Sequence, residues 1–247
     1  MRELWHLIQG EFIKMRRTKL FRIHLMIPVA GAAVFLLYYS FSLWSPPGKV
    51  QGYLETMASV YPFLAGLICA MSVELEEEGH MQTFLLSGRR KCSIFLGKWL
   101  ALLMLSFTAA AVAVLGFAAG YEFILRENPF SAGFYIRSLF AIWLGAAVLY
   151  AFHLFLSLRF GKSVSLAAGI AESVLSAVML TGLGEGCWPF FPCAWGGRWS
   201  SYLLVYEAGS LPQKITGELA VCAAAAVLII AGIFLWFHYY EGRRSEE

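Results

Sequence analysis

The side chains best able to do chemistry in this sequence are carboxylates set among apolar residues. Four glutamates cluster within residues 74–78, and Glu172 stands alone inside a long uncharged run. Intramembrane proteases can use adjacent glutamates as an acid–base pair, and that pattern also needs an arginine four positions after the second glutamate. Gln82 occupies this position after Glu77–Glu78. The acidic cluster therefore does not indicate a protease.

Patterns for nucleotide, metal and nucleophile chemistry are also incomplete. Gly161-Lys162-Ser163 ends like a phosphate-binding loop, but that motif needs a glycine where Leu156 stands. No G-x-S-x-G turn is present, and the histidines show no metal-ligand spacing. We therefore expect no catalytic residue, metal or cofactor on this chain, and we expect any ATP and Mg²⁺ to be bound by another polypeptide. The five histidines are His6, His24, His80, His153 and His238.

The composition is that of an integral membrane protein. Hydrophobic residues make up 59% of the 247 positions, and the mean hydropathy is +0.66. A soluble globule of this length could not cover so many apolar surfaces. A membrane helix needs about 20 apolar residues, and six stretches approach that length. The predicted spans, which make the chain an all-α membrane protein, are 25–44, 56–73, 99–121, 138–158, 163–184 and 219–240.

The distribution of positive charge predicts the orientation. Basic residues gather on the cytoplasmic side of membrane proteins, and with a cytoplasmic N-terminus the predicted inner segments hold 14 of the 19 basic residues. We therefore expect both termini in the cytoplasm and a location in a bacterial cell membrane. The basic residues on the inner side would be Arg2, Lys14, Arg16, Arg17, Lys19, Arg22, Arg89, Arg90, Lys91, Lys98, Arg159, Lys162, Arg243 and Arg244.

The segment before the first span has a helical period. Trp5, Ile8, Phe12 and Met15 recur at helical spacing, while basic residues fall elsewhere. This pattern predicts an amphipathic interfacial helix within residues 1–22, with its apolar side in lipid. A plain positively charged anchor is the alternative.

Residues 74–98 form the longest polar segment between predicted spans on the cytoplasmic side. Within it Met81, Phe84 and Leu85 would share one face of a short helix, which Gly88 could end. A short helix whose apolar side chains are surrounded by charged ones is suited to docking into a groove of a soluble partner. A solvated charged loop explains the same pattern.

The order of these elements resembles that of ABC-type exporter permeases. The resemblance rests on Glu74-x-Glu76-Glu77-Glu78-Gly79, on Leu85-Leu86-Ser87-Gly88-Arg89-Arg90 and on Lys98. The size, the six spans and the aromatic-proline segment 187–192 are similar to the small permease subunits of lantibiotic-immunity transporters of the nisin and mutacin type. That resemblance implies a coupling helix between spans two and three, pushed by a cytoplasmic ABC ATPase dimer, and a second, different permease subunit. The residues it assigns to ATPase coupling are Glu77, Glu78, Gly79, Met81, Phe84, Leu85 and Arg89.

Two further regions are candidates for the substrate pathway. Glu172 lies near the centre of the fifth span, where a carboxylate is costly and must face protein or water. It could meet a cationic group of a substrate, or it could make a structural hydrogen bond. Residues 185–217 are too polar and too rich in glycine and proline to continue a helix, so they predict an aromatic extracellular loop against the lipid headgroups, with Cys187 and Cys193 either free or paired. The aromatic candidates for first contact with a peptide are Trp188, Phe190, Phe191 and Trp195.

The sequence thus predicts a permease subunit of an ATP-driven exporter that expels a lantibiotic or similar antimicrobial peptide. Membrane lipid and the peptide are the expected partners besides the ATPase and the second permease, and nucleic acid is not. An ABC permease for another drug, lipid or bacteriocin is an alternative, and so is an ATP-independent immunity or scaffold protein.

Overall fold

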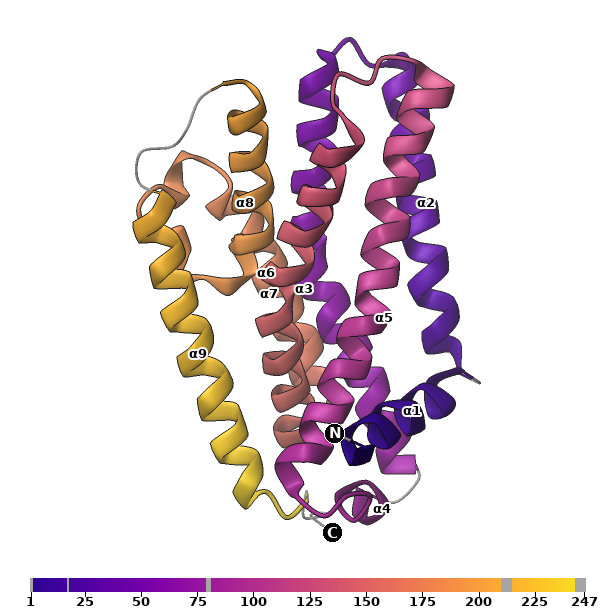
Figure 1. Ribbon diagram of the computed structural model, residues 1–247, viewed down its shortest axis with the longest axis vertical. Coiled ribbons are helices and arrows are strands. Elements are labelled where there is room, and N and C mark those ends of the chain that lie inside the picture. The colour runs from indigo at the N-terminus through magenta and orange to yellow at the C-terminus, as the bar shows by residue number, and fades with distance from the viewer. Residues whose placement is uncertain (1, 17, 79–80, 210–214, 243–247) are drawn as a thin grey trace.

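The computed structural model describes residues 2–16, 18–78, 81–209 and 215–242, and every regular element within them is a helix. Long helices stand side by side in an elongated bundle, with α2 at one edge and α9 at the other (Figure 1). Among the described residues, six helices are long and apolar enough to cross a membrane, as the sequence predicts. These helices are α2 (Lys19–Phe41), α3 (Pro46–Glu78), α5 (Lys91–Gly120) with its π-helical extension η1 (Tyr121–Leu125), α6 (Ala132–Phe160), α7 (Lys162–Met179) and α9 (Ile215–Tyr239).

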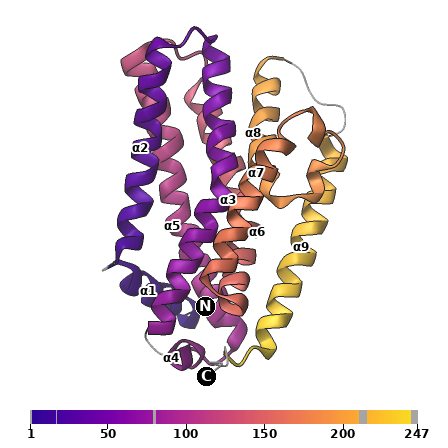
Figure 2. The ribbon, with the colours of Figure 1, turned by 180° about the vertical axis from the view of Figure 1, so that it is seen from behind.

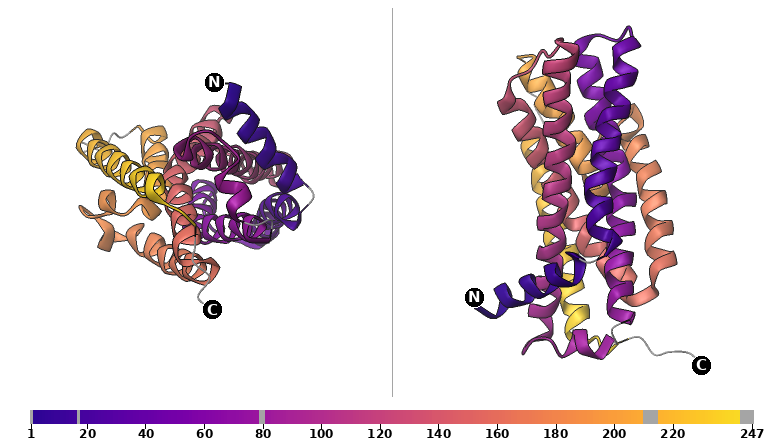
Figure 3. Two further views of the ribbon diagram at one scale, coloured as in Figure 1. Left: turned by 90° about the horizontal axis from the view of Figure 1, so that it is seen from below. Right: turned by 90° about the vertical axis from the view of Figure 1, so that its right-hand side faces the viewer.

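The first helix crosses one end of the bundle. α1 (Arg2–Arg16) lies at a steep angle to the long helices, at the end where α9 also finishes (Figure 3). Its Ile8 and Met15 are buried against the protein, whereas Trp5 is 53% exposed. The expected amphipathic helix is therefore present, but Ile8, Phe12 and Met15 of its predicted apolar stripe pack on this chain. Its position in the membrane interface stays a prediction.

The expected cytoplasmic loop at 74–98 is largely helical, which corrects that boundary. α3 continues through the acidic cluster to Glu78, and α5 begins at Lys91. The short helix α4 (Met81–Leu85) lies between them at the end of the bundle. At 1.5 Å per residue, the 33 residues of α3 extend about 50 Å, well beyond the roughly 30 Å of a hydrocarbon core. Hydropathy detects only the apolar part of such a helix.

The expected extracellular loop at 185–217 is a second correction. Two 3₁₀ turns, η2 (Gly182–Gly184) and η3 (Trp188–Phe190), lead into a helix, α8 (Pro192–Glu207). This connection and α8 fold beside one half of α9 (Figure 2). The glycines that argued against a helix are what allow it to dock. A Cβ atom on Gly145 of α6 would lie 2.5 Å from the backbone nitrogen of Gly196 in α8.

A second close crossing joins α3 and α7 in the middle of the bundle. A Cβ atom on Gly66 would lie 2.8 Å from the carbonyl oxygen of Ser165, and one on Gly169 would lie 3.0 Å from the Cα atom of Phe63. Small residues at both positions let the two backbones approach, as is usual where membrane helices associate. This crossing brings the polar residues of both helices together.

Candidate functional site: the α4 end of the bundle and the α3–α7 crossing

Four charged side chains meet behind α4, and we call them the four-charge cluster: Glu11 and Lys14 of α1, Glu76 of α3 and Lys98 of α5. The Nζ atom of Lys98 donates to Glu76 Oε1 at 2.6 Å and to Glu11 Oε2 at 2.7 Å. Lys14 Nζ donates to Glu76 Oε1 at 2.6 Å and forms an ion pair with Glu11. The cluster ties three helices together with two positive and two negative charges.

The members of the cluster differ sharply in exposure. The side chain of Lys98 is 1% exposed and that of Lys14 is 39% exposed. Burial opposes the charge of Lys14, but Glu11 and Glu76 outweigh it and raise its pKa above the usual 10.5. Lys14 is therefore charged at neutral pH, at the rim of a network whose centre is Lys98.

The apolar face of α4 is turned toward this cluster and not toward solvent. Phe84 is 2% exposed, and the Nζ atoms of Lys98 and Lys14 lie 5.1 and 5.7 Å from its ring centre. Its ring also meets that of Phe237 in α9 at 6.3 Å. Met81 and Leu85 are partly buried against the same core. These three predicted coupling residues hold α4 in place, so they do not form a free docking face.

The exposed side of the α4 region carries different residues. Glu77 and Glu78 at the end of α3 are exposed, and so is Arg89, whose backbone N–H donates to Glu3 Oε1 of α1 at 2.8 Å. Gly79, the remaining predicted coupling residue, lies outside the described residues. Leu86 is 82% exposed just after α4. The outward surface is made of Gln82, Thr83, Leu86, Ser87, Arg89 and Arg90.

Glu172 belongs to a polar network at the α3–α7 crossing. Its Oε2 atom lies 3.0 Å from Nε2 of His153 in α6, and Nδ1 of that ring lies 3.2 Å from Ser165 Oγ. The Ser165 hydroxyl in turn lies 3.2 Å from the carbonyl oxygen of Gly66. The side chain of His153 is fully buried, while that of Glu172 is 20% exposed. The carboxylate is thus oriented by protein on one side and open on the other.

A groove of about 510 Å³, lined by both polar and apolar side chains, runs from this level toward the far end of the bundle between α3 and α7. Its walls include Ser59, Ser173 and Thr181, together with Glu55, whose Oε1 atom accepts hydrogen bonds from Gln51 at 2.8 Å and Ser201 at 2.9 Å. We call this surface the α3–α7 groove. With Glu172 nearby on α7, it places two carboxylates along the same pair of helices.

The aromatic candidates separate into buried and exposed residues. Trp188 and Trp195 are 0% and 2% exposed, so they fill the interior beneath α8 and do not line a surface. Phe190 is 66% exposed and Phe191 is partly buried. Cys187 and Cys193 are both free thiols. Of the four aromatic residues, Phe190 has the surface that contact with a membrane-bound peptide requires.

Sequence reasoning missed several residues that organise this structure. Arg198 of α8 is buried, and its guanidinium donates to the carbonyl oxygens of Met179 and Thr181 at 2.7 and 2.8 Å, which caps the end of α7. Glu55 and Lys98 each stand one residue outside a predicted span. That position next to an apolar run was the available signal, but Lys98 was interpreted as evidence of orientation and of the family resemblance, and not as the partner of buried carboxylates.

One comparison with known proteins places the chain in a family. A family model described as "ABC-2 family transporter protein" matches residues 7–178, more than two thirds of the chain, from α1 to the last turn of α7. No curated protein matches the sequence.

Proposed function

This chain belongs to the ABC-2 family of transporter proteins as a membrane permease subunit, and from that premise we propose that it exports an antimicrobial peptide of the lantibiotic type. In this proposal a cytoplasmic ABC ATPase dimer drives the chain together with a second, different permease. The peptide leaves the bilayer toward the outside, and both termini of the chain face the cytoplasm.

The α3–α7 groove is the observation that supports a peptide substrate. A peptide that is both cationic and amphipathic presents ammonium groups and apolar side chains together. Glu172, one-fifth exposed, and Glu55 offer carboxylates along two helices whose surroundings are apolar. A carboxylate at membrane depth attracts a cation more strongly than one in water, because the local dielectric constant is low.

The test of the substrate uses cells that carry the complete transporter. Glu172→Gln keeps the size of the side chain and can still hydrogen-bond to His153, but it removes the charge. We expect about tenfold higher sensitivity to a cationic lantibiotic, which corresponds to the loss of one charge-assisted contact of roughly 1.4 kcal/mol. Glu122→Gln is the matched control, since Glu122 is exposed and lies away from the groove.

Two results would contradict this part of the proposal. If Glu172→Gln is expressed normally and protects the cells as well as the wild type, the carboxylate does not contact the substrate. If cells without the transporter become sensitive to uncharged drugs and not to the peptide, the substrate is a different compound.

The test of coupling targets the outward surface of the α4 region. Leu86→Arg places a charge on a side chain that is 82% exposed and so leaves the fold intact. We expect it to reduce co-purification of the ATPase, because exposed apolar side chains are typical contact points for a partner. Leu43→Arg is the control, since Leu43 is fully exposed just after Phe41, at the end of α2 that is far from α1. Equal ATPase recovery from both variants would exclude Leu86 from the contact.

A further inference from the structure

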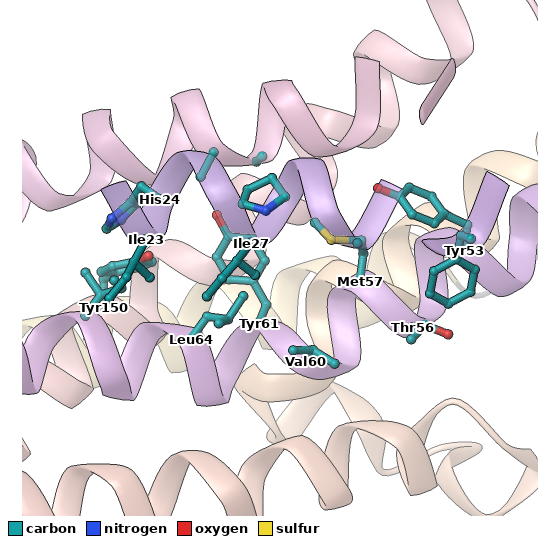
Figure 4. A pocket seen from close by; sticks show the side chains of 16 residues that line it. Ile23, His24, Ile27, Tyr53, Thr56, Met57, Val60, Tyr61, Leu64 and Tyr150 are labelled. Carbon is teal, nitrogen blue, oxygen red and sulfur yellow. The ribbon is translucent and has the colours of Figure 1, made fainter. Parts of the chain in front are cut away.

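An apolar cavity of about 150 Å³ opens between α2 and α3, and it shares Thr56 and Val60 of α3 with the wall of the α3–α7 groove. α5 and α6 contribute Ala109, Ala110 and Tyr150 to its wall. His24 and Tyr150 lie at one end of the cavity, and Tyr53 and Thr56 lie at the other (Figure 4). None of the functional residues described above lines it.

The cavity is long and narrow. Along α2 its lining runs from Ile23 to Phe35, and twelve residues of helix correspond to about 18 Å. Nearly all of the lining is aliphatic or aromatic. Ile27 and Val60 at its margin are 39% and 42% exposed, so the cavity opens sideways, where hydrocarbon surrounds a membrane protein. The length and the sideways opening suit a segment of one extended alkyl chain, the rest of which would lie in the surrounding hydrocarbon.

His24 supplies one polar atom in this apolar setting. The residue is 6% exposed, and its Nδ1 atom lies 2.9 Å from the carbonyl oxygen of Leu20. A carbonyl oxygen only accepts, so Nδ1 carries the proton, and Nε2 of the neutral ring is a hydrogen-bond acceptor. Within the described part of the chain, no atom pairs with this buried Nε2. A buried polar atom without a partner costs free energy, which a ligand with a donor group would recover.

The position of His24 along α2, close to the end of the helix, also fits the binding of an amphiphile. His24 lies five residues after Lys19, where α2 begins, which corresponds to about 7 Å along the helix. A polar group bound there would sit near one surface of the bilayer, and the attached chain would point along α2 toward the middle. This is the orientation that a membrane amphiphile already has.

We propose that this cavity binds one alkyl chain of a membrane amphiphile whose polar end carries a hydroxyl, amide or ammonium donor. The donor bonds to Nε2 of His24, and the chain lies between α2 and α3. Binding at this site does not depend on the ATPase or on the exported peptide, so it can be tested independently of the proposed function.

The experiment uses the full chain in vesicles of dioleoylphosphatidylcholine, a lipid without a hydrogen-bond donor. The probe is hexadecanol with a photoreactive diazirine in the middle of its chain, and its adducts are mapped by mass spectrometry. We expect adducts on the parts of α2 and α3 that line the cavity, Met57 and Val60 among them. Unlabelled hexadecanol should compete about threefold to tenfold better than hexadecane, the effect of one hydrogen bond of roughly 0.7–1.4 kcal/mol.

Two variants test the site itself. Gly31 lines the cavity, and a Cβ atom there meets nothing within 4 Å, so Gly31→Leu fills the space without a backbone clash and should abolish the adducts. Gly232→Leu in α9 is the matched control, because its Cβ also meets nothing within 4 Å, and it should label normally. His24→Phe should retain the adducts and remove the preference for the alcohol over the alkane.

The proposal is overturned if Gly31→Leu labels like the wild type, or if adducts are spread evenly over α9 and the other lipid-facing helices. It is also overturned if the wild type does not distinguish hexadecanol from hexadecane, since Nε2 then has no donor to bind. Melting temperatures establish that Gly31→Leu is folded. If it is not, the competition measured with His24→Phe decides the question, and ATPase co-purification reports separately on the proposed function.

Discussion

Replacing Lys98 by methionine should strongly destabilise the protein, although Lys98 lies outside the α3–α7 groove. Methionine keeps the length and apolar stem of lysine and removes the ammonium group. Glu11 and Glu76 then remain behind α4 with only Lys14 to balance them. Removal of one partner from a buried ion pair leaves the other charge without full compensation by water or protein.

The structure sets the size of the effect. Lys98 makes two charge-assisted hydrogen bonds, at 2.6 and 2.7 Å, and hydrogen bonds to charged groups are worth about 1.5–3 kcal/mol each. Its contact with the Phe84 ring at 5.1 Å adds roughly 0.5–2 kcal/mol. These values are consistent with the about 3–5 kcal/mol lost when a buried pair is broken. For a chain of this length that loss corresponds to a fall in melting temperature of roughly 6–20 °C.

Lys14→Met is the matched control for this prediction. Lys14 binds the same two carboxylates, but its side chain is 39% exposed, so solvent screens its ion pairs. Such pairs are worth about 0–1 kcal/mol, which is a few degrees at most. Thermal unfolding of both variants in the same detergent, followed by tryptophan fluorescence, measures the difference. Equal shifts for the two lysines, or a Lys98→Met protein as stable as the wild type, would refute the view that Lys98 is the centre of the cluster.

Two further substitutions test the packing of α8. Gly145→Ala should destabilise the protein by about 1–3 kcal/mol, because its Cβ atom would lie 2.5 Å from the backbone nitrogen of Gly196. In the control Gly116→Ala the new Cβ atom meets nothing within 4 Å, so this variant should be stabilised by roughly 0.5–1 kcal/mol. The melting temperature should therefore fall in the first variant and rise in the second, and shifts of the same sign would contradict the prediction. Arg198→Met should reduce the stability by about 2–6 kcal/mol, since it leaves two carbonyl oxygens at the end of α7 without donors. Amide hydrogen exchange at the end of α7 should therefore become faster. The control is Arg137→Met, which removes an exposed ion pair with Glu207 and should leave this exchange unchanged. Unchanged exchange at the end of α7 would show that the cap is not needed.

The six long helices could be predicted because the signal for them is local. Each contains an apolar stretch of about 20 residues, and a hydropathy window of that length finds it. The ends could not be predicted in the same way. A hydropathy window finds only the uncharged part of a helix, whereas α3 and α5 also include the charged residues at Glu74–Glu78 and Lys91–Lys98.

The residues that hold the structure together were harder to predict, because their partners are far apart in sequence. Lys98 bonds to Glu11, 87 residues away, and Arg198 caps a helix end 19 residues away. Neither spacing forms a motif. The glycines of α8 were misleading for a related reason: low helix propensity is a local property, whereas the close approach of Gly196 to α6 depends on the tertiary fold.

The amphipathic pattern of residues 81–86 coincides with a short helix, and Phe84 on its apolar face is covered by this chain itself. An apolar face indicates that something covers the face, and it does not say whether the cover is another protein or the same chain. Here Phe84 packs between two lysines of the four-charge cluster and Phe237. A single turn of helix has little stability of its own, so α4 needs this internal packing before it can present its other side to a partner.

That packing has a consequence for transport. A force applied to the outward surface of α4 reaches Phe84, and through the cluster it reaches Glu76 of α3. Glu76 and Glu55 lie on the same continuous helix, 21 residues or about 32 Å apart, and Glu55 lines the α3–α7 groove. Pro62 interrupts the backbone donors between them, and the N–H of the next residue, Phe63, donates to Ser173 Oγ of α7 at 3.1 Å. We therefore expect motion at α4 to reach the groove along α3 itself, and the hydrogen bond from Phe63 to Ser173 beside Pro62 to pass that motion to α7.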